Sequence, residues 1–581
     1  MADNKLPAEL WNYIFDLAAD EDVIYQYGLP DFTAEHAWLK IFHSEWSLRA
    51  PQMALDQLQR QSYITKKAII STCKFWNHIG TEFLYRCLFF DRPAMLVTLA
   101  QRFASFESQH TNTVSPGWWT KRIHIRQYYS PNSLSQETID YALASIVKSC
   151  PNLEIFVVDW PLTTTLTFMR IADSLATYSH RNLRTIHWKV PCETLPKVIW
   201  ALDSLPYLLS ANISFKPPVT EDAIEHLGSA FDVHLTLRYL QQLFVEGHVG
   251  EFLEQATGWS LPALRSLSID CGVNSHDQPD VATFLTIHGG DLMFLNLNSI
   301  PPLAVRKILD LCPSLIAFSF NADWRLEQQG SIAMGTDQSL LVNRPHEGIR
   351  FIGLHGLQHA FGVGVVGENA TRQPLPARFI SRTNDSNVEA LNRSNFPNLQ
   401  VVRCLNRTLL EDLNKADGPS EASGGLERWD RWYNRFSNIG VRLEDCTGAL
   451  LGTLPQDNED GDHEYDSDEY EDEEVYEHEI EVEYDGELDE EDEELARYKY
   501  EYGYEEEEDD EEGWEIPIPP LPRNDDLPKT KVLRDLLLEC RSMNETREEP
   551  MFPSMQQSMM ALTFMGMDNG SSSMSGPSSL F

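Results

Sequence analysis

Residues 150–158, with the sequence CPNLEIFVV, contain a short unit that recurs through the middle of this chain. The unit is an apolar residue, two variable residues, and then two apolar residues separated by one position. Such alternation predicts a strand with one buried face, and the Pro-Asn pair before it predicts a turn. Helical spacing of apolar residues precedes some copies, as at Ile139, Leu143 and Ile146. Each unit is therefore expected to combine a helix with a strand.

Several copies of this unit follow one another, and Ile123 with Ile125 is a candidate for the start of the series. A degenerate copy contains Leu208, Ala211 and Ile213. The steps between copies range from 23 to 50 residues, and the longest step, which includes 361–395, is expected to contain a long surface loop. The clear copies begin at Leu153, Leu183, Leu240, Leu264, Leu292, Leu315, Ile349 and Leu399.

This series resembles the leucine-rich repeat, in which units stack because a single unit cannot bury its own apolar face. The period is irregular here. The asparagine that usually follows the last apolar position is absent, and Gly272, Ile300 and Asp323 stand at three of those places. The resemblance implies an irregular α/β solenoid over residues 91–448. The alternative is a compact α/β domain in which the unit marks buried parallel strands.

The N-terminal stretch 6–15, LPAELWNYIF, predicts an amphipathic helix with a proline at its start. A second helical run from Tyr63 to Phe90 contains Cys73 and Trp76. Together the two stretches resemble the F-box, a helical module that docks onto the Skp-type adaptor of a cullin ubiquitin ligase. The order of module and repeats is similar to that of fungal F-box proteins with degenerate repeats and an insertion in the module.

The resemblance implies an F-box-like module over residues 1–90, with an insertion at about 21–62. The alternative is a helical cap that protects the open end of the repeat array. The residues that the resemblance implies for adaptor binding are Leu6, Pro7, Leu10, Ile14, Cys73 and Trp76.

If the middle region is a repeat array, the strand positions between the buried ones line one exposed surface. His124, Asp159 and His187 fall on this surface. The residues expected to contact a protein substrate there are Phe244, Phe294, Phe351, His355 and Arg403.

The acidity of the chain is concentrated near its C-terminus. Between Gln456 and Glu515 there are 34 Asp and Glu residues against only Arg497 and Lys499, and the whole chain has a net charge of −43. Like-charge repulsion and low apolar content predict a disordered acidic run over 449–515, followed by a disordered Pro/Met/Ser-rich tail over 516–581. Such a run is either a solubilising tail or an interaction tail for basic proteins such as histones.

Motifs that would indicate catalysis or metal binding are lacking in the sequence. There is no GxSxG, GxxxxGK[ST] or HExxH, and the nine cysteines are scattered without a CxxC. Residues 362–367, GVGVVG, match GxGxxG, but Pro374 and Pro376 argue against the helix that a phosphate site needs after the loop. We therefore expect no enzymatic activity, no cofactor and no metal site.

The composition also bears on the compartment. No apolar run reaches the ~18 residues that a membrane span needs. The N-terminus lacks the apolar region of a signal peptide, and scattered unpaired cysteines are typical of a reduced intracellular protein. We expect an intracellular protein, cytoplasmic or nuclear, that binds neither membrane nor nucleic acid directly.

The function expected from these observations is substrate recognition within a Skp-cullin-F-box type E3 ubiquitin ligase. The N-terminal module would bind the Skp-type adaptor and cullin assembly, and the repeat region would bind a protein substrate that the sequence does not identify. The alternative is an acidic-tailed leucine-rich-repeat interaction protein that binds basic partners such as histones, without assembling a ligase.

Overall fold

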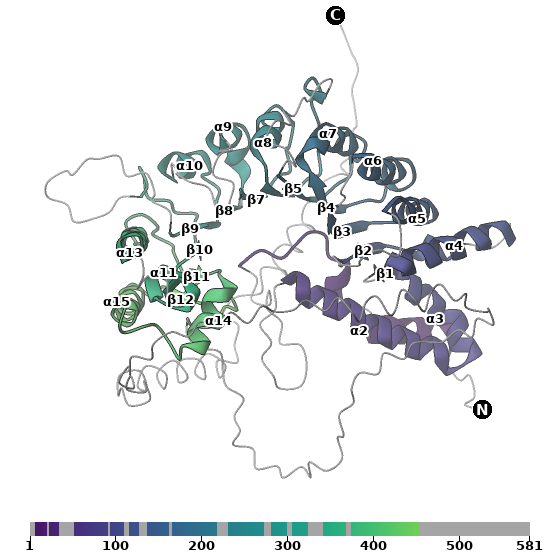
Figure 1. Ribbon diagram of the computed structural model, residues 1–581, viewed down its shortest axis with the longest axis horizontal. Coiled ribbons are helices and arrows are strands. Elements are labelled where there is room, and N and C mark those ends of the chain that lie inside the picture. Colours follow the sequence, from purple (N-terminus) through teal and green to yellow (C-terminus); the bar gives the residue numbers. More distant parts are fainter. Residues whose placement is uncertain are drawn as a thin grey trace, which may run out of the picture. The chain divides into compact units, whose positions relative to one another are not determined.

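The protein is an α/β structure built on one 12-stranded parallel sheet. Each strand pairs in parallel with the next strand along the chain, so the order in the sheet runs from β1 to β12 without a reversal (Figure 1). The computed structural model describes residues 6–19, 22–33, 51–90, 93–109, 115–126, 136–161, 165–217, 230–271, 280–298, 305–323, 341–367 and 374–451.

The strands are short. In chain order they are β1 (Cys87–Phe90), β2 (Arg122–Ile125), β3 (Ile155–Pro161), β4 (Thr185–Pro191), β5 (Ser210–Lys216), β6 (Gln242–Gly247), β7 (Ser266–Asp270), β8 (Phe294–Asn298), β9 (Ala317–Asn321), β10 (Phe351–His355), β11 (Val401–Cys404) and β12 (Arg442–Glu444).

Helices precede the sheet and connect its strands. Those used below are α1 (Ala8–Ala19), α2 (Pro51–Thr72), α3 (Lys74–Arg86), α4 (Pro93–Gln109), α5 (Gln136–Ser149), α6 (Thr165–Ser174), α7 (Leu195–Asp203), α8 (Gly250–Thr257), α9 (Val281–His288), α10 (Val305–Leu311), α11 (Gln358–Phe361), α13 (Pro374–Ala390), α14 (Arg407–Lys415) and α15 (Gly425–Asn438).

Helices α5 to α10 lie in a row along one face of the sheet (Figure 1). The main core lies between this row and the strands. The last two apolar residues of every predicted unit lie in a strand and are at most 2% exposed, as are Phe156 and Val158 of β3 and Ile186 and Trp188 of β4. The predicted strands are thus confirmed for all the copies, including the degenerate one in β5.

The turn before several strands links neighbouring units through a side chain. The residue just before the first leucine donates a hydrogen bond to a main-chain carbonyl of the previous turn. Asn152 donates to Trp118, Asn182 to Pro151, Ser314 to Gly290, and Asn398 to Glu347, at 2.8 to 3.0 Å. A small polar residue at this position therefore satisfies a carbonyl of the neighbouring turn.

Two boundaries near the N-terminus differ from expectation. The helical run ends at Arg86, and residues 87–90 form β1, because these consecutive apolar residues pair with β2, with Leu88 and Phe90 in the main core and Cys87 and Phe89 facing α2. Helix α2 begins at Pro51, so the predicted insertion overlaps its first three turns. Residues 34–50 lie outside the described residues.

Two expectations for the C-terminal part of the sheet are also wrong. The long loop expected within 361–395 contains the 17-residue helix α13, which packs against α11. Residues 449–451, assigned to the acidic run, belong to the sheet domain: Leu451 is buried and its N–H donates to the Leu443 carbonyl at 3.0 Å. The rest of the predicted acidic run and the Pro/Met/Ser-rich tail lie outside the described residues.

Candidate partner-binding surfaces

Helices α1, α2 and α3 form a module with a hydrophobic core of its own. Trp76 of α3 lies against Trp11 and Phe15 of α1, with ring centroids 4.7 and 5.1 Å away. Phe15 also meets Phe83 of α3 edge to face at 6.0 Å. This cluster is separate from the main core of the sheet. Aromatic packing therefore holds one stripe of α1 onto α3.

The orientation of the module's helices is set by one close approach and one cation. A Cβ at Gly80 of α3 would lie 2.9 Å from the Ile70 side chain of α2, so these helices meet where a side chain is missing. Arg86 lies 4.0 Å over the Phe83 ring and pairs with Asp16 of α1 at 2.5 Å. The guanidinium thus connects the end of α3 to α1 and covers the aromatic core.

The opposite stripe of α1 is apolar and exposed. Leu10, Ile14 and Leu17 are 48, 40 and 68% exposed, and Tyr13 lies on the same side of the helix. Leu6 and Pro7 are also exposed and precede the first turn. A surface helix usually carries polar residues on its outer face, so an outer apolar stripe indicates a further partner. Four predicted adaptor-binding residues (Leu6, Pro7, Leu10 and Ile14) lie together on this stripe.

The other two predicted adaptor-binding residues hold the module together. Cys73 is the N-cap of α3, and its Sγ accepts a hydrogen bond from the Trp76 N–H at 3.4 Å. Trp76 is half-buried between the helices. Trp76 therefore positions α1 on α3, whereas Cys73 caps α3 and remains exposed.

The face of the sheet opposite the helix row, here called the open face, is covered at one end by α2. The Gln59 amide of α2 contacts His124 Nδ1 of β2 at 2.9 Å, and the Arg60 guanidinium lies 5.7 Å from the Phe89 ring centroid of β1. His124 and Asp159 are consequently buried. The expectation that these two residues are exposed is wrong, because a helix of the N-terminal module packs on them.

Four ionisable residues form a buried network beneath α2. His124 Nε2 lies 3.1 Å from Asp159 Oδ2 and 3.6 Å from Asp56 Oδ1, and His187 Nδ1 lies 3.4 Å from Asp159 Oδ1. Burial raises the pKa of Asp56 and lowers that of His187 to about 4. Burial also opposes the charge of Asp159, but the hydrogen bond from His124 and the charge of His187 outweigh it and lower its pKa to about 2.

Among the described residues, the side chains that converge closely enough to hold a metal ion are those of Asp56, His124 and Asp159. Arg126 Nε lies 3.7 Å from Asp56 Oδ2, and Arg122 is buried nearby. These cations already compensate the carboxylates, so we interpret the network as a structural contact that seats α2 on the sheet. Sequence reasoning missed it because its members are far apart in the chain.

The predicted substrate-binding residues lie along the open face on β6, β8, β10 and β11. Phe244, Phe351 and His355 are partly exposed. Phe294 and Arg403 are only 8 and 4% exposed, which contradicts the expectation that they are accessible. The physical reason is a segment of the N-terminal region, residues 22–33, which lies on both of them.

The middle of the open face is polar and uncharged around His355. Its Nε2 donates to Asn296 Oδ1 at 2.9 Å, and Ser319 Oγ donates to the same oxygen at 2.6 Å. Burial lowers the pKa of His355 to about 4, so the imidazole is neutral at physiological pH. This region therefore presents neutral polar groups next to the aromatic rings of Phe294 and Phe351.

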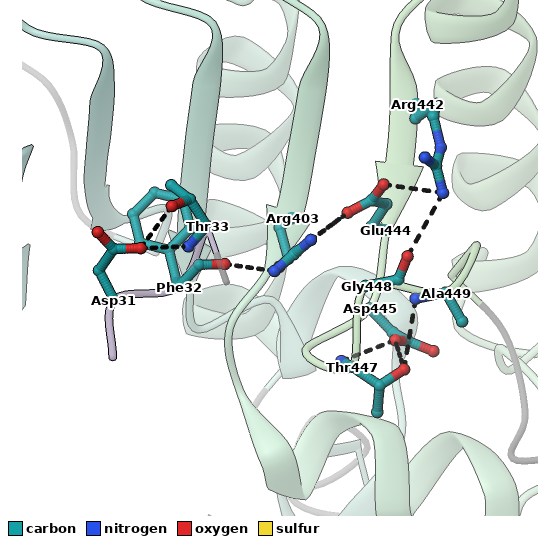
Figure 2. A network of polar contacts seen from close by, with 10 residues as sticks. All are labelled: Asp31, Phe32, Thr33, Arg403, Arg442, Glu444, Asp445, Thr447, Gly448 and Ala449. Carbon is teal, nitrogen blue, oxygen red and sulfur yellow. Dashed lines mark hydrogen bonds and ion pairs between the residues drawn. The ribbon is translucent and has the colours of Figure 1, made fainter. Parts of the chain in front are cut away.

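Arg403 lies between the segment 22–33 and strand β12 (Figure 2). Its Nε and Nη2 lie 3.0 and 2.7 Å from Glu444 Oε2, and its Nη1 donates to the Phe32 carbonyl. Burial raises the pKa of Glu444, and the neighbouring charges of Arg403 and Arg442 oppose that rise. The buried guanidinium is thus shared between the sheet and the N-terminal region.

The glycine-rich stretch 362–367 does not have the surroundings of a phosphate site. It follows the short helix α11, where the motif needs a strand. Gly362 and Gly364 have φ values of +63° and +65°, which explains the glycines by backbone conformation. The expectation that the prolines exclude a helix was wrong, because α13 begins at Pro374 and prolines are tolerated in a first helical turn.

Within the part of the chain that the structure describes, no helix is both long and apolar enough to cross a bilayer. A scan against models of protein families and a search of curated proteins found no match to this chain. Its function must therefore be inferred from its own residues and their geometry.

Proposed function

We propose that this chain is the substrate-recognition subunit of a Skp-cullin-F-box type E3 ubiquitin ligase. Helices α1 to α3 would act as the F-box-like module, and the sheet with its helix row as an irregular leucine-rich-repeat-like solenoid. The observation that carries the proposal is the exposed apolar stripe of α1, which starts at the Leu-Pro pair and lies on a module with its own core.

The strand order supports the repeat part of this proposal. Each strand contacts its neighbours in sequence, and several helices of the row pack against the next helix, as α5 does against α6 and α8 against α9. Nearest-neighbour contacts of this kind are typical of stacked repeats. In the proposed assembly the chain contributes no reacting group, and it raises the effective concentration of substrate lysines near a recruited conjugating enzyme.

The apolar stripe can supply part of the free energy of an adaptor contact. Full burial of one aliphatic side chain contributes roughly 1.5–3 kcal/mol, and a micromolar complex needs about 8 kcal/mol. Leu6, Leu10, Ile14 and Leu17 are 39 to 68% exposed, so burial of their remaining surface contributes about 3–6 kcal/mol, and other contacts must supply the rest. Replacing two of them with aspartate would place charges in an apolar contact, which is far more costly than the loss of the burial alone.

The test is a pull-down of recombinant Skp-type adaptor with the variant Leu10→Asp/Ile14→Asp. We expect adaptor binding to fall by at least a hundredfold, while the thermal melt stays within a few degrees of the unchanged chain because both side chains are exposed. Ile287→Asp is the matched control, since Ile287 of α9 is also an exposed aliphatic residue, outside the module. A folded double variant that binds the adaptor normally would disprove the F-box assignment.

A pull-down with the unchanged chain from cell extract distinguishes the ligase function from the alternative function, the binding of basic proteins. The acidic composition of 456–515 favours this alternative. If core histones co-purify and neither adaptor nor cullin does, the chain acts as a binder of basic proteins. A chain that ends at Leu451 should then lose the histones, because it lacks the acidic run.

A further inference from the structure

The segment 22–33, here called the strap, crosses the open face of the sheet. Its contacts follow the order of the strands. The Ile24 carbonyl accepts from Arg122 of β2 at 2.9 Å, and Tyr27 donates to Glu154, just before β3, at 2.5 Å. Farther along, Leu29 contacts β6 and Phe32 reaches β8 and β11. Twelve consecutive residues thus lie over much of the sheet, and after Tyr25 they form neither helix nor strand.

The sheet recognises the main chain of the strap at one residue. Gln242 Oε1 accepts from the Leu29 N–H at 3.0 Å, and Gln242 Nε2 donates to the Leu29 carbonyl at 2.9 Å. Because the carboxamide bonds the main-chain N–H and C=O of Leu29, this contact does not depend on the side chain at that position. The Ser210 hydroxyl donates to Gln242 Oε1 at 2.9 Å and holds the amide in this orientation.

Two side-chain positions of the strap are restricted, and both restrictions have a clear origin. Gly28 has a φ of +85°, and a Cβ there would lie 2.2 Å from Gln242 Oε1, so only glycine fits. Four residues later, the Phe32 ring lies 5.3 Å from the Phe294 ring of β8, and Arg403 holds its carbonyl (Figure 2). The surface therefore selects a glycine and an aromatic ring at the fourth position after it.

The strap is held less firmly than the core elements. Ile24 is its one fully buried residue, and Tyr27 and Pro30 are exposed. The hydrogen bonds at Tyr27, Leu29 and Phe32 are exposed or partly buried, so water can compete for the same groups, whereas the bond at the Ile24 carbonyl is buried. A segment held in this way is suited to exchange with a second peptide of the same pattern.

We propose that the open face of the sheet is a peptide-binding surface, and that the strap occupies it in cis until a partner displaces it. The partner is a protein with an irregular or extended segment that carries a glycine and, four positions later, an aromatic residue. Naming this partner as the ligase substrate rests on the proposed function; the peptide-binding surface itself does not.

The test uses a labelled peptide of residues 22–33, DVIYQYGLPDFT, with the full chain and measures fluorescence anisotropy. In the unchanged chain the tethered strap competes at an effective concentration of about millimolar, so the peptide should bind weakly. The variant Gly28→Val cannot seat its strap. We expect it to bind the peptide at least tenfold more tightly than the unchanged chain does.

Two controls identify the contact. A peptide with the same Gly28→Val change should not bind, and the double variant Gly28→Val/Gln242→Ala should lose the affinity gained. If Gly28→Val does not fold, Phe32→Ala releases the strap more gently and should show a smaller gain. Hydrogen exchange at Leu29 reports strap release directly, because its N–H is protected only while Gln242 accepts from it.

The proposal would be overturned if hydrogen exchange at Leu29 shows that the strap has left the sheet and yet neither variant binds the peptide at about 1 mM. The strap would then be a fixed part of the fold. Protection of Leu29 that persists in both variants would overturn the proposal as well. Adaptor binding through α1 is measured separately. If the chain binds the peptide but not the adaptor, the peptide-binding surface is supported and the ligase function is excluded. If it binds the adaptor but not the peptide, only the peptide-binding surface is excluded.

Discussion

At the scale of single residues, the Arg403–Glu444 pair shows how the sheet accommodates charge in its interior. Both side chains are almost fully buried on adjacent strands, and the carboxylate also pairs with Arg442 at 3.0 Å. A buried ion pair stabilises little relative to apolar residues of the same size, but removal of one partner leaves an uncompensated charge. The stability of the fold therefore depends on keeping both partners or replacing both.

This reasoning predicts the stability of Arg403 variants. Arg403→Met should lower the free energy of unfolding by about 3–5 kcal/mol, because Glu444 loses its main partner in the interior. The double variant Arg403→Met/Glu444→Leu should recover most of that loss. Urea unfolding of the two variants and of Glu444→Leu completes the cycle. A double variant no more stable than Arg403→Met would show that the charge is not the cause of the loss.

At the scale of elements, α1 depends on a small aromatic cluster for its position and offers its other stripe to solvent. Phe83 is central to this cluster, since it contacts Phe15 and lies under the Arg86 guanidinium. Because the cluster is separate from the main core, the module can loosen without disturbing the sheet. Adaptor binding would then fail indirectly, through loss of the helix position.

Phe83→Ala should therefore destabilise the module by about 3–5 kcal/mol, the usual cost of truncating a buried aromatic ring. Hydrogen exchange should accelerate in α1 and α3 and remain unchanged in β4 to β8. Tyr13→Ala, an exposed aromatic position of α1, is the control and should change exchange little. Equal acceleration in the strands would mean that the module and the sheet unfold as one unit.

At the scale of the whole molecule, the described part of the sheet domain extends to Leu451. Leu451 is buried, and the Asp445 N–H donates to the Ala449 carbonyl at 2.9 Å, so the last residues fold back onto β12. The change in composition near residue 449 suggested that the sheet domain ends before that point. An average composition over several residues there is dominated by the acidic run that follows. One buried leucine after β12 extends the folded part beyond that point.

Two truncations test this boundary. A chain that ends at Leu451 should melt at the temperature of the full chain, because residues 456–515 are dominated by like charges and residues 516–581 are Pro-, Met- and Ser-rich, so neither stretch is expected to join the core. A chain that ends at Gly448 should melt lower, on the order of 5 °C, because it exposes the apolar edge that Leu451 covers. Equal melting of both truncated chains would place the boundary at 448.

Much of the fold could be predicted from local patterns. Apolar residues at alternate positions, as at Phe156 and Val158 or at Ile186 and Trp188, predict a strand with one buried face. The reason is that every second side chain of a strand points to the same face of the sheet. The same patterns could not predict β1 or α13. Apolar residues at 87–90 are compatible with either a helix or a strand, and Pro374 reads as a helix breaker although it lies where proline is tolerated.

The sequence by itself determined the strand positions, the apolar stripe of α1 and the division into a repeat region and an acidic run. These follow from periods of two and 3.6 residues and from local charge, which need no knowledge of distant contacts. Only the tertiary structure decided which strand residues are accessible. His124, Phe294 and Arg403 occupy positions that alternation assigns to an exposed face, yet α2 and the strap bury them. Burial of this kind comes from residues some 60 to 370 positions away, such as Gln59 over His124 and Phe32 over Arg403, and no local pattern records it.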